Sequence, residues 1–178
     1  MSKHHGLVGA VVRSEMLLGF VAACLPTVGT AFAADNDPLA VFELGAAAEW
    51  SLNGGSSFGP SAAVEFTPIE NWLEIETGVT ALFGRGQTEW DTDFVFKKPF
   101  DVSPAVEFEP GIGPVWVHTS GGGRTNDAIG AEVVADFMFW PTPDRKLGWF
   151  LEPSYTQTFG SGHELSLGVT AGLLIPIK

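Results

Sequence analysis

Acidic side chains are the groups in this sequence that are best suited to chemistry, and three of them alternate within one short segment. Glu89, Asp91 and Asp93 follow a Gly-rich stretch at 84–86. Carboxylate oxygens are the ligands that hard cations such as Ca²⁺ prefer, so this segment is a candidate cation site. The alternative interpretation is a solvated acidic loop that binds nothing.

Other ligand and nucleophile types are scarce. The chain has four histidines and one cysteine, and His4, His5 and Cys24 all lie in a leader-like N-terminal segment. With only His118 and His163 left, we expect no His-based metal site and no organic cofactor. Without a second cysteine, neither a disulfide nor thiol chemistry is expected.

The N-terminal segment predicts export. Lys3 and Arg13 precede an apolar run at 16–28, and Ala-Phe-Ala at 31–33 is a typical cleavage site for a signal peptide. The run is too short for a membrane-spanning helix. An alternative is that Val-Ala-Ala-Cys at 21–24 is a lipoprotein processing box, which would make Cys24 a lipidated N-terminus.

The predicted organisation is therefore a cleaved signal peptide at 1–33, an N-terminal tail at 34–40 and one domain at 41–178. The formal net charge of the chain is −12, and removal of the leader leaves it strongly acidic. This charge argues against nucleic acid or anionic lipid as partners.

The chain beyond Pro38 alternates apolar with small or acidic residues and shows no sustained helical period, which indicates an all-β domain. Eight strands are expected, at 41–50, 58–67, 72–83, 90–98, 104–118, 129–140, 147–158 and 164–175. The predicted fold is an eight-stranded antiparallel up-and-down β-barrel of the transmembrane type. The strands are long enough to cross a bilayer, which takes roughly 9 to 11 tilted residues.

The predicted connections fall into two groups that alternate along the chain. Those at 67–71, 99–103 and 141–146 are short and contain proline, as periplasmic turns do. Those at 53–55, 84–86, 120–123 and 160–162 are Gly-rich. Pro110, Pro114 and Pro153 lie within predicted strands, where each removes a ladder hydrogen bond, so we expect bulges or bends there.

One face of the predicted strands is apolar and the other is polar and acidic. If the polar face lines the lumen, the lumen contains these acids: Glu43, Glu65, Glu74, Glu76, Glu107, Glu109, Glu132, Asp136, Glu152 and Glu164. Lys97 is the one base that clearly joins them. Enclosing like charges is unfavourable unless they are hydrated, protonated or matched by cations.

A period of two does not say which face points outward, so a soluble lipocalin-like periplasmic barrel shares this pattern. The six tryptophans favour the membrane barrel because they lie at or near strand ends, where two interfacial girdles would be. Three lie toward the Gly-rich loops and three toward the Pro-rich turns: Trp50, Trp90 and Trp116, then Trp72, Trp140 and Trp149.

The chain resembles the small outer-membrane β-barrel proteins of Gram-negative bacteria. The resemblance rests on the leader, the eight alternating strands and segments such as Phe-Glu-Leu-Gly at 42–45 and Glu-Pro-Gly-Ile-Gly-Pro at 109–114. The resemblance covers the mature chain. It implies an outer-membrane location, with outer-membrane lipids, lipopolysaccharide and the barrel-assembly machinery as partners. It implies no particular activity, and no oligomeric state. This chain ends Ile-Pro-Ile-Lys, whereas such proteins usually end in an aromatic residue.

A second resemblance concerns catalysis. His118-Thr119-Ser120, followed by Glu132, is similar to the His-x-Ser and later Glu of outer-membrane lipid A deacylases. The resemblance implies that Ser120 attacks an acyl ester, His118 takes its proton and Glu132 orients the imidazole. That family has Asn after the Ser, where this chain has Gly121. The alternative is an interfacial histidine beside a Gly-rich turn.

The function that we expect from the sequence is a non-catalytic structural or envelope-interaction barrel. The main alternative is a narrow cation-preferring pore, since the many acids and glycines would favour a hydrated path. Two further alternatives are the soluble ligand-binding barrel and the lipid A deacylase-like esterase.

Overall fold

The computed structural model describes residues 38, 40–84, 86–159 and 164–177. The predicted signal peptide lies outside these residues, as does the predicted tail apart from Pro38 and Ala40. Within the described residues there is no helix long and apolar enough to cross a membrane. The described chain is almost entirely strand and turn.

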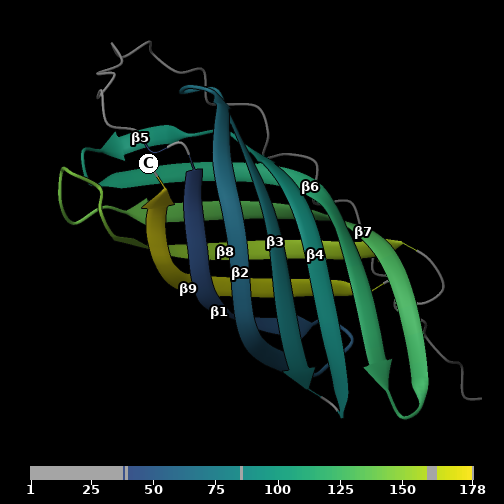
Figure 1. The fold of residues 1–178 in the computed structure, drawn as a ribbon. Coiled ribbons are helices and arrows are strands. Elements are labelled where there is room, and N and C mark those ends of the chain that lie inside the picture. The colour runs from purple at the N-terminus through teal and green to yellow at the C-terminus, as the bar shows by residue number, and fades with distance from the viewer. Residues whose placement is uncertain (1–37, 39, 85, 160–163, 178) are drawn as a thin grey trace, which may run out of the picture. The chain divides into compact units, whose positions relative to one another are not determined.

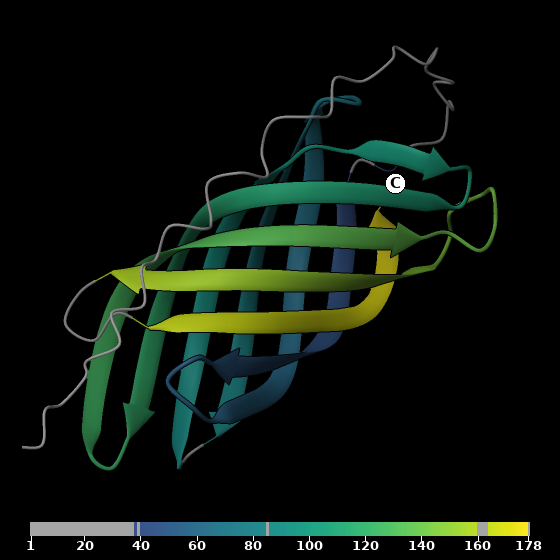
Figure 2. The same ribbon diagram turned by 180° about the vertical axis from the view of Figure 1, so that it is seen from behind.

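The strands form one antiparallel sheet that closes on itself (Figures 1 and 2). Consecutive strands pair in order except β4 and β5, which both pair with β6, and the pairing of β1 with β9 completes the circle. The strand bounds are β1 Ala40–Ser51, β2 Ser56–Ile69, β3 Leu73–Gly84, β4 Gln87–Lys97, β5 Phe100–Ser103, β6 Val106–Gly121, β7 Arg124–Phe139, β8 Gly148–Phe159 and β9 Leu165–Ile177. The prediction of an eight-stranded antiparallel barrel is confirmed, because the short β5 extends an existing strand.

The relation of β5 to β4 corrects the predicted turn at 99–103. Lys97 pairs with Gly111 of β6, and Phe100 pairs with Phe108 in the same register. The strand therefore continues past Lys98 and Pro99, and it is interrupted there because proline has no N–H to give to the ladder. The tight turn lies further along, at Pro104 and Ala105.

The β6–β7 hairpin is also longer than the sequence predicts. Its two strands have 16 residues each, and they stay in register up to the pair Gly121 and Arg124. The turn consists of Gly122 and Gly123 alone, with φ of 58° and 76°. Two positive φ values are what a two-residue hairpin turn requires, and glycine adopts them without strain. The predicted start of this strand at residue 129 was therefore wrong by five residues.

Two of the prolines within strands, Pro114 and Pro153, lie where pairing is interrupted without being shifted. The β4–β6 ladder runs to Asp93 and Val115 and resumes at Phe96 and Ile112 in the same register, and the gap contains Pro114. The β7–β8 ladder has a similar gap that contains Pro153. The expected bulge is absent at both positions, because each proline removes one ladder donor and leaves the spacing of the strands intact.

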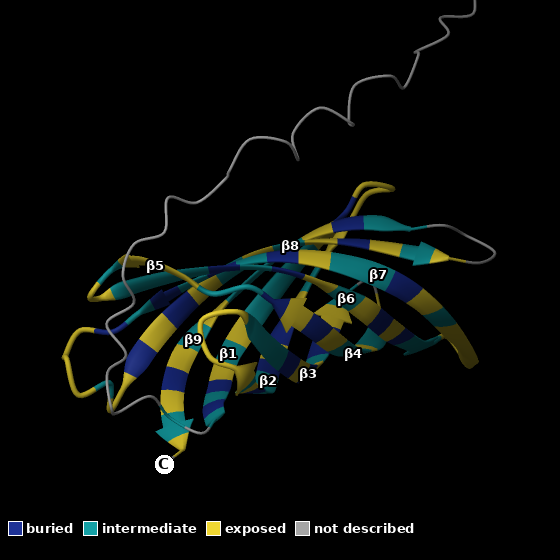
Figure 3. Cartoon of the chain, turned by 90° about the horizontal axis from the view of Figure 1, so that it is seen from above, coloured by how far each residue is buried: buried dark blue, intermediate teal, exposed yellow. Residues whose placement is uncertain are grey.

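The two faces of the barrel wall differ in polarity, and exposure alternates along the strands (Figure 3). The outward side chains are large and apolar, and the most exposed include Phe58, Ile112, Ile129, Leu44 and Leu173. The inward side chains include most of the buried carboxylates. This orientation is opposite to that of a soluble lipocalin-like barrel, so that alternative was wrong.

Five of the six tryptophans are between 45% and 59% exposed, namely Trp50, Trp72, Trp90, Trp116 and Trp149. Trp140 was predicted to join them and does not, since only 2% of it is exposed. It belongs to an inward apolar cluster with Val41, Met138, Phe150 and Leu174. Trp140 has the same parity as the inward residues Asp136 and Met138, so the alternation of faces continues one residue past the end of β7.

Candidate functional site

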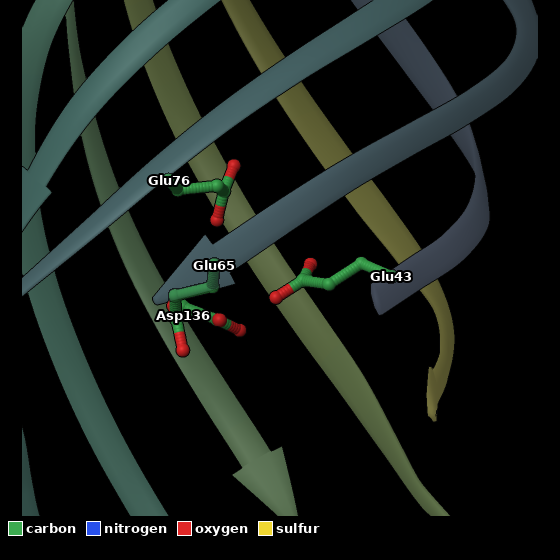
Figure 4. Close-up of side chains that lie close together, drawn as sticks. All are labelled: Glu43, Glu65, Glu76 and Asp136. Atoms are coloured by element: carbon green, nitrogen blue, oxygen red, sulfur yellow. The ribbon is translucent and has the colours of Figure 1, made fainter. Parts of the chain in front are cut away.

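The lumen brings together carboxylates that are far apart in the sequence. Glu43, Glu65, Glu76 and Asp136 come from β1, β2, β3 and β7, and their side chains point toward one another (Figure 4). Each is at most 5% exposed. Each occupies an inward position of its strand, so closure of the barrel is what places them in one cluster.

Lys97 of β4 supplies the positive charge of this cluster. Its ammonium lies 3.1 Å from Asp136 Oδ2, 3.1 Å from Glu152 Oε2 and 3.4 Å from Glu65 Oε2, and it also contacts Glu76. The Lys97 side chain has no solvent exposure. A buried ammonium is tolerated when its three donors meet acceptors, and this one does. We call Lys97 with these four carboxylates the lysine network.

The lysine network lies between two cavities. Glu65 lines the cavity toward the chain termini, of about 190 Å³. Glu76 and Glu152 line the cavity toward the Gly-rich loops, of about 60 Å³. The side chains that separate the two spaces are nearly or fully excluded from solvent.

Three of the other predicted lumen acids have separate polar partners. Glu107 accepts a 2.7 Å hydrogen bond from Trp140 Nε1 and lies 2.9 Å from the Arg145 guanidinium. Glu132 accepts a hydrogen bond from Thr156 Oγ1 at 3.3 Å. Thr67 Oγ1 donates to Glu74 at 3.1 Å. Two predicted acids complete the set: Glu109, which is 2% exposed, and Glu164, which lines a small cavity near the loops.

The acids Glu89, Asp91 and Asp93 do not form the exposed loop that the sequence suggested. They lie within β4, and all three line cavities inside the barrel. Glu89 accepts a hydrogen bond from Thr119 Oγ1 at 3.1 Å. The strand begins earlier than predicted, at Gln87, so Glu89 also lies within it, and all three acids have the inward parity of Lys97.

The three candidate catalytic residues are not assembled as the sequence suggested. Glu132 lines the inner cavity, whereas His118 lies beside the exposed ring of Trp116 on the outer face, with ring centroids 5.8 Å apart and the rings tilted by 43°. The partner of His118 is instead Asp127, directly across the hairpin, with Nδ1 and Oδ1 2.8 Å apart. Ser120, two residues further along β6, donates to the carbonyl of Thr88 at 3.4 Å.

Two polar residues of these sites were not singled out in the sequence. Asp127 was missed because β7 was expected to begin at residue 129. The two glycines at 122–123 indicate a two-residue turn, and a register counted from that turn pairs Asp127 with His118. Arg145 lies in a turn, with a φ of 43°, and reaches Glu107 from there. No alternation rule applies to a turn residue, so only the tertiary structure shows this contact.

Comparison with known proteins gives similarity in structure but not in sequence. No protein-family profile and no curated protein sequence matches the chain. Neisserial surface protein A is similar with a TM-score of 0.62 at 16% identity, over 78% of this chain and 96% of that one. The N-terminal β-barrel domain of Pseudomonas aeruginosa OprF has a TM-score of 0.53 at 13% identity, over 76% and 97% of the two chains. The outer membrane enzyme PagL has a TM-score of 0.53 at 14% identity, over 76% and 99%.

The chain has the fold of the small eight-stranded outer-membrane β-barrels. The predicted resemblance is therefore confirmed at the level of the fold. Identities of 16% or less assign no activity to this barrel, and the similar structures include an enzyme.

Proposed function

We propose that this chain is a non-catalytic, non-conducting barrel of the bacterial outer membrane with a structural or envelope-interaction role. The observation that carries the proposal is the lysine network across the middle of the lumen. A conducting path would have to pass a buried ammonium held by four carboxylates. Breaking such a network exposes uncompensated buried charges, so a spontaneous opening is strongly unfavourable.

The outer surface supports a location in a membrane. The eight barrel strands have 11 to 16 residues each, which exceeds the roughly 9 to 11 residues needed to cross a bilayer. Large apolar side chains face outward along them, for example Val79, Ile112, Val133 and Leu173, which are 43% to 59% exposed. An exposed apolar surface that surrounds a barrel is typical of contact with lipid. Outer-membrane lipids, lipopolysaccharide and the assembly machinery remain the proposed partners.

Two measurements on one preparation test the proposal. The protein should fractionate with the outer membrane and migrate differently on a detergent gel when unboiled, because a closed barrel resists unfolding by detergent. In planar bilayers the folded protein should give no conductance steps. Reproducible cation-selective steps would instead establish the narrow pore, and recovery from the periplasm without detergent would exclude the membrane barrel.

A second candidate function, ester hydrolysis at the outer surface, is favoured by the His118–Asp127 pair. Asp127 orients the imidazole through Nδ1–H, which leaves Nε2 as the base. Ser120 Oγ would turn from the Thr88 carbonyl, attack an ester carbonyl and pass its proton to Nε2. The leaving alcohol would take that proton, and water would then release the acyl group from Ser120. The substrate would be an acyl ester of a membrane lipid, since these residues lie beside Trp116 on the outer face.

Acyl release from a long-chain ester in detergent micelles tests this candidate. We expect Ser120→Ala to abolish release and Asp127→Asn to lower kcat by roughly 10²- to 10⁴-fold, because the base loses its orientation. Glu132→Gln is the matched control, since Glu132 lies on the inner face. Activity that depends on Glu132 and not on Asp127 would contradict the assignment, and no release by the unaltered protein would exclude esterase activity.

A further inference from the structure

The cavity toward the chain termini is lined by three carboxylates that lie close together. Glu65, Glu74 and Glu109 come from β2, β3 and β6, and each offers one oxygen within 4.8 Å of the others. All three line the cavity of about 190 Å³. Because the barrel brings three strands together at this point, the cluster is absent from any single segment of the sequence.

The oxygens of this cluster are only partly satisfied. Thr67 holds one oxygen of Glu74, while Glu74 Oε2 has no hydrogen-bond partner among the described residues. Glu109 is 98% buried, and its Oε2 likewise has no partner in the described part of the chain. A buried carboxylate oxygen without a donor is strongly destabilising. Glu109 also shares a hydrogen bond with Glu74, so a proton or a cation must lie between these carboxyl groups.

The basic groups nearest to the cluster are engaged elsewhere. Lys97 reaches Glu65 only at 3.4 Å, and its shorter contacts are with Glu76, Asp136 and Glu152. Arg145 lines the same cavity but pairs with Glu107 at 2.9 Å. The three carboxyl groups therefore lie close together, and the contact of Lys97 with Glu65 is a long one.

We propose that Glu65, Glu74 and Glu109 bind a divalent cation of the Ca²⁺ class inside the terminal half of the barrel. The donor set consists of oxygen alone, which hard cations prefer, and sulfur or imidazole ligands that would select a transition metal are not part of it. Ca²⁺ accepts 6 to 8 oxygens at about 2.3 to 2.6 Å in flexible geometry, and the cavity has room for waters to complete the shell. The neighbouring cluster of Glu43, Glu65, Glu76 and Asp136 differs because the Lys97 ammonium already occupies it.

Trp140 makes the site measurable. Its ring lines the same cavity, and its Nε1–H is held by Glu107. Tb³⁺ is an oxygen-seeking substitute for Ca²⁺ that emits when a nearby tryptophan is excited. With the full folded chain in detergent at neutral pH, we expect saturable Tb³⁺ emission that Ca²⁺ displaces. Trp140→Phe should remove most of the emission while calorimetry still detects Ca²⁺.

The carboxylate variants decide the assignment. Glu109→Gln and, separately, Glu74→Gln should weaken Ca²⁺ at least about tenfold, because each removes a charged ligand. Glu132→Gln, which changes an acid of the other cavity, should leave the affinity unchanged. Heat-modifiable migration verifies that each variant is folded. Absence of Ca²⁺ binding to the unaltered protein, as expected if the carboxylates share protons instead, would overturn the proposal, as would equal weakening by Glu132→Gln.

Discussion

Inside the barrel, one ammonium faces four carboxylates, so Lys97 is the residue whose replacement should most disturb the interior. Lys97→Met keeps a long side chain and removes the charge, which leaves buried carboxylates such as Asp136 without their cation. We expect the free energy of unfolding to fall by about 3 to 5 kcal/mol, the range for breaking a buried ion pair. Urea unfolding in detergent, followed by tryptophan fluorescence, measures this change.

The next residue provides the control for that measurement. Lys98 is only half-buried; it donates to the Asn71 carbonyl and lies 5.3 Å from the centre of the Phe100 ring. Lys98→Met should therefore change the stability by no more than about 1 kcal/mol, as for exposed charges. Equal losses for the two variants would show that the lysine network does not hold the lumen together.

At the scale of the strands, close backbone approach decides which positions tolerate a side chain. A Cβ at Gly113 of β6 would lie 1.9 Å from the Phe94 carbonyl oxygen of β4, so the strands would have to separate. We expect Gly113→Ala to destabilise the barrel by about 1 to 3 kcal/mol, as overpacking does. Gly168→Ala is the matched control, since its Cβ would closely meet only the Ser154 hydroxyl, which rotates away. The unfolding midpoints of the two variants test this, and a larger loss at Gly168 would contradict it.

At the scale of the whole molecule, the outward apolar surface predicts that the free-energy cost of an outward-facing charge depends on its depth in the bilayer. Ile112 is 59% exposed near the middle of β6, whereas Ile129 of β7 is 64% exposed and pairs with Trp116 near one end of the barrel. In lipid vesicles, Ile112→Lys should cost about 2 to 4 kcal/mol and Ile129→Lys about 0 to 1 kcal/mol, because a charge near the interface stays hydrated. Refolding titrations in vesicles measure both values. Identical values, or none above zero at Ile112, would mean that this face does not contact lipid.

The sequence by itself determined the class of fold, because alternation with a period of two is a local property. The parity within each strand separates Glu74 and Glu76 from Leu73 and Ile75, and the turn residues divide the chain into eight strands. The same parity indicated that Lys97 joins the acids of the polar face. It also marked Met138 and Phe150 as inward residues, although their bulk argued otherwise and they were not singled out.

Closure of the barrel decided the rest. Whether Glu65 meets Lys97, or Glu109 meets Glu74, depends on the register between neighbouring strands, and one residue of difference in a turn changes every partner. The continuation of β4 into β5 accompanies the register of β4 with β6, and the two-glycine turn sets the register of β6 with β7, which places Asp127 rather than Glu132 beside His118. Trp140 continues the inward parity of Asp136 and Met138, and packing against Phe150 and a hydrogen bond to Glu107 hold it there. These contacts join residues far apart in the chain, so a pattern read along the sequence does not contain them.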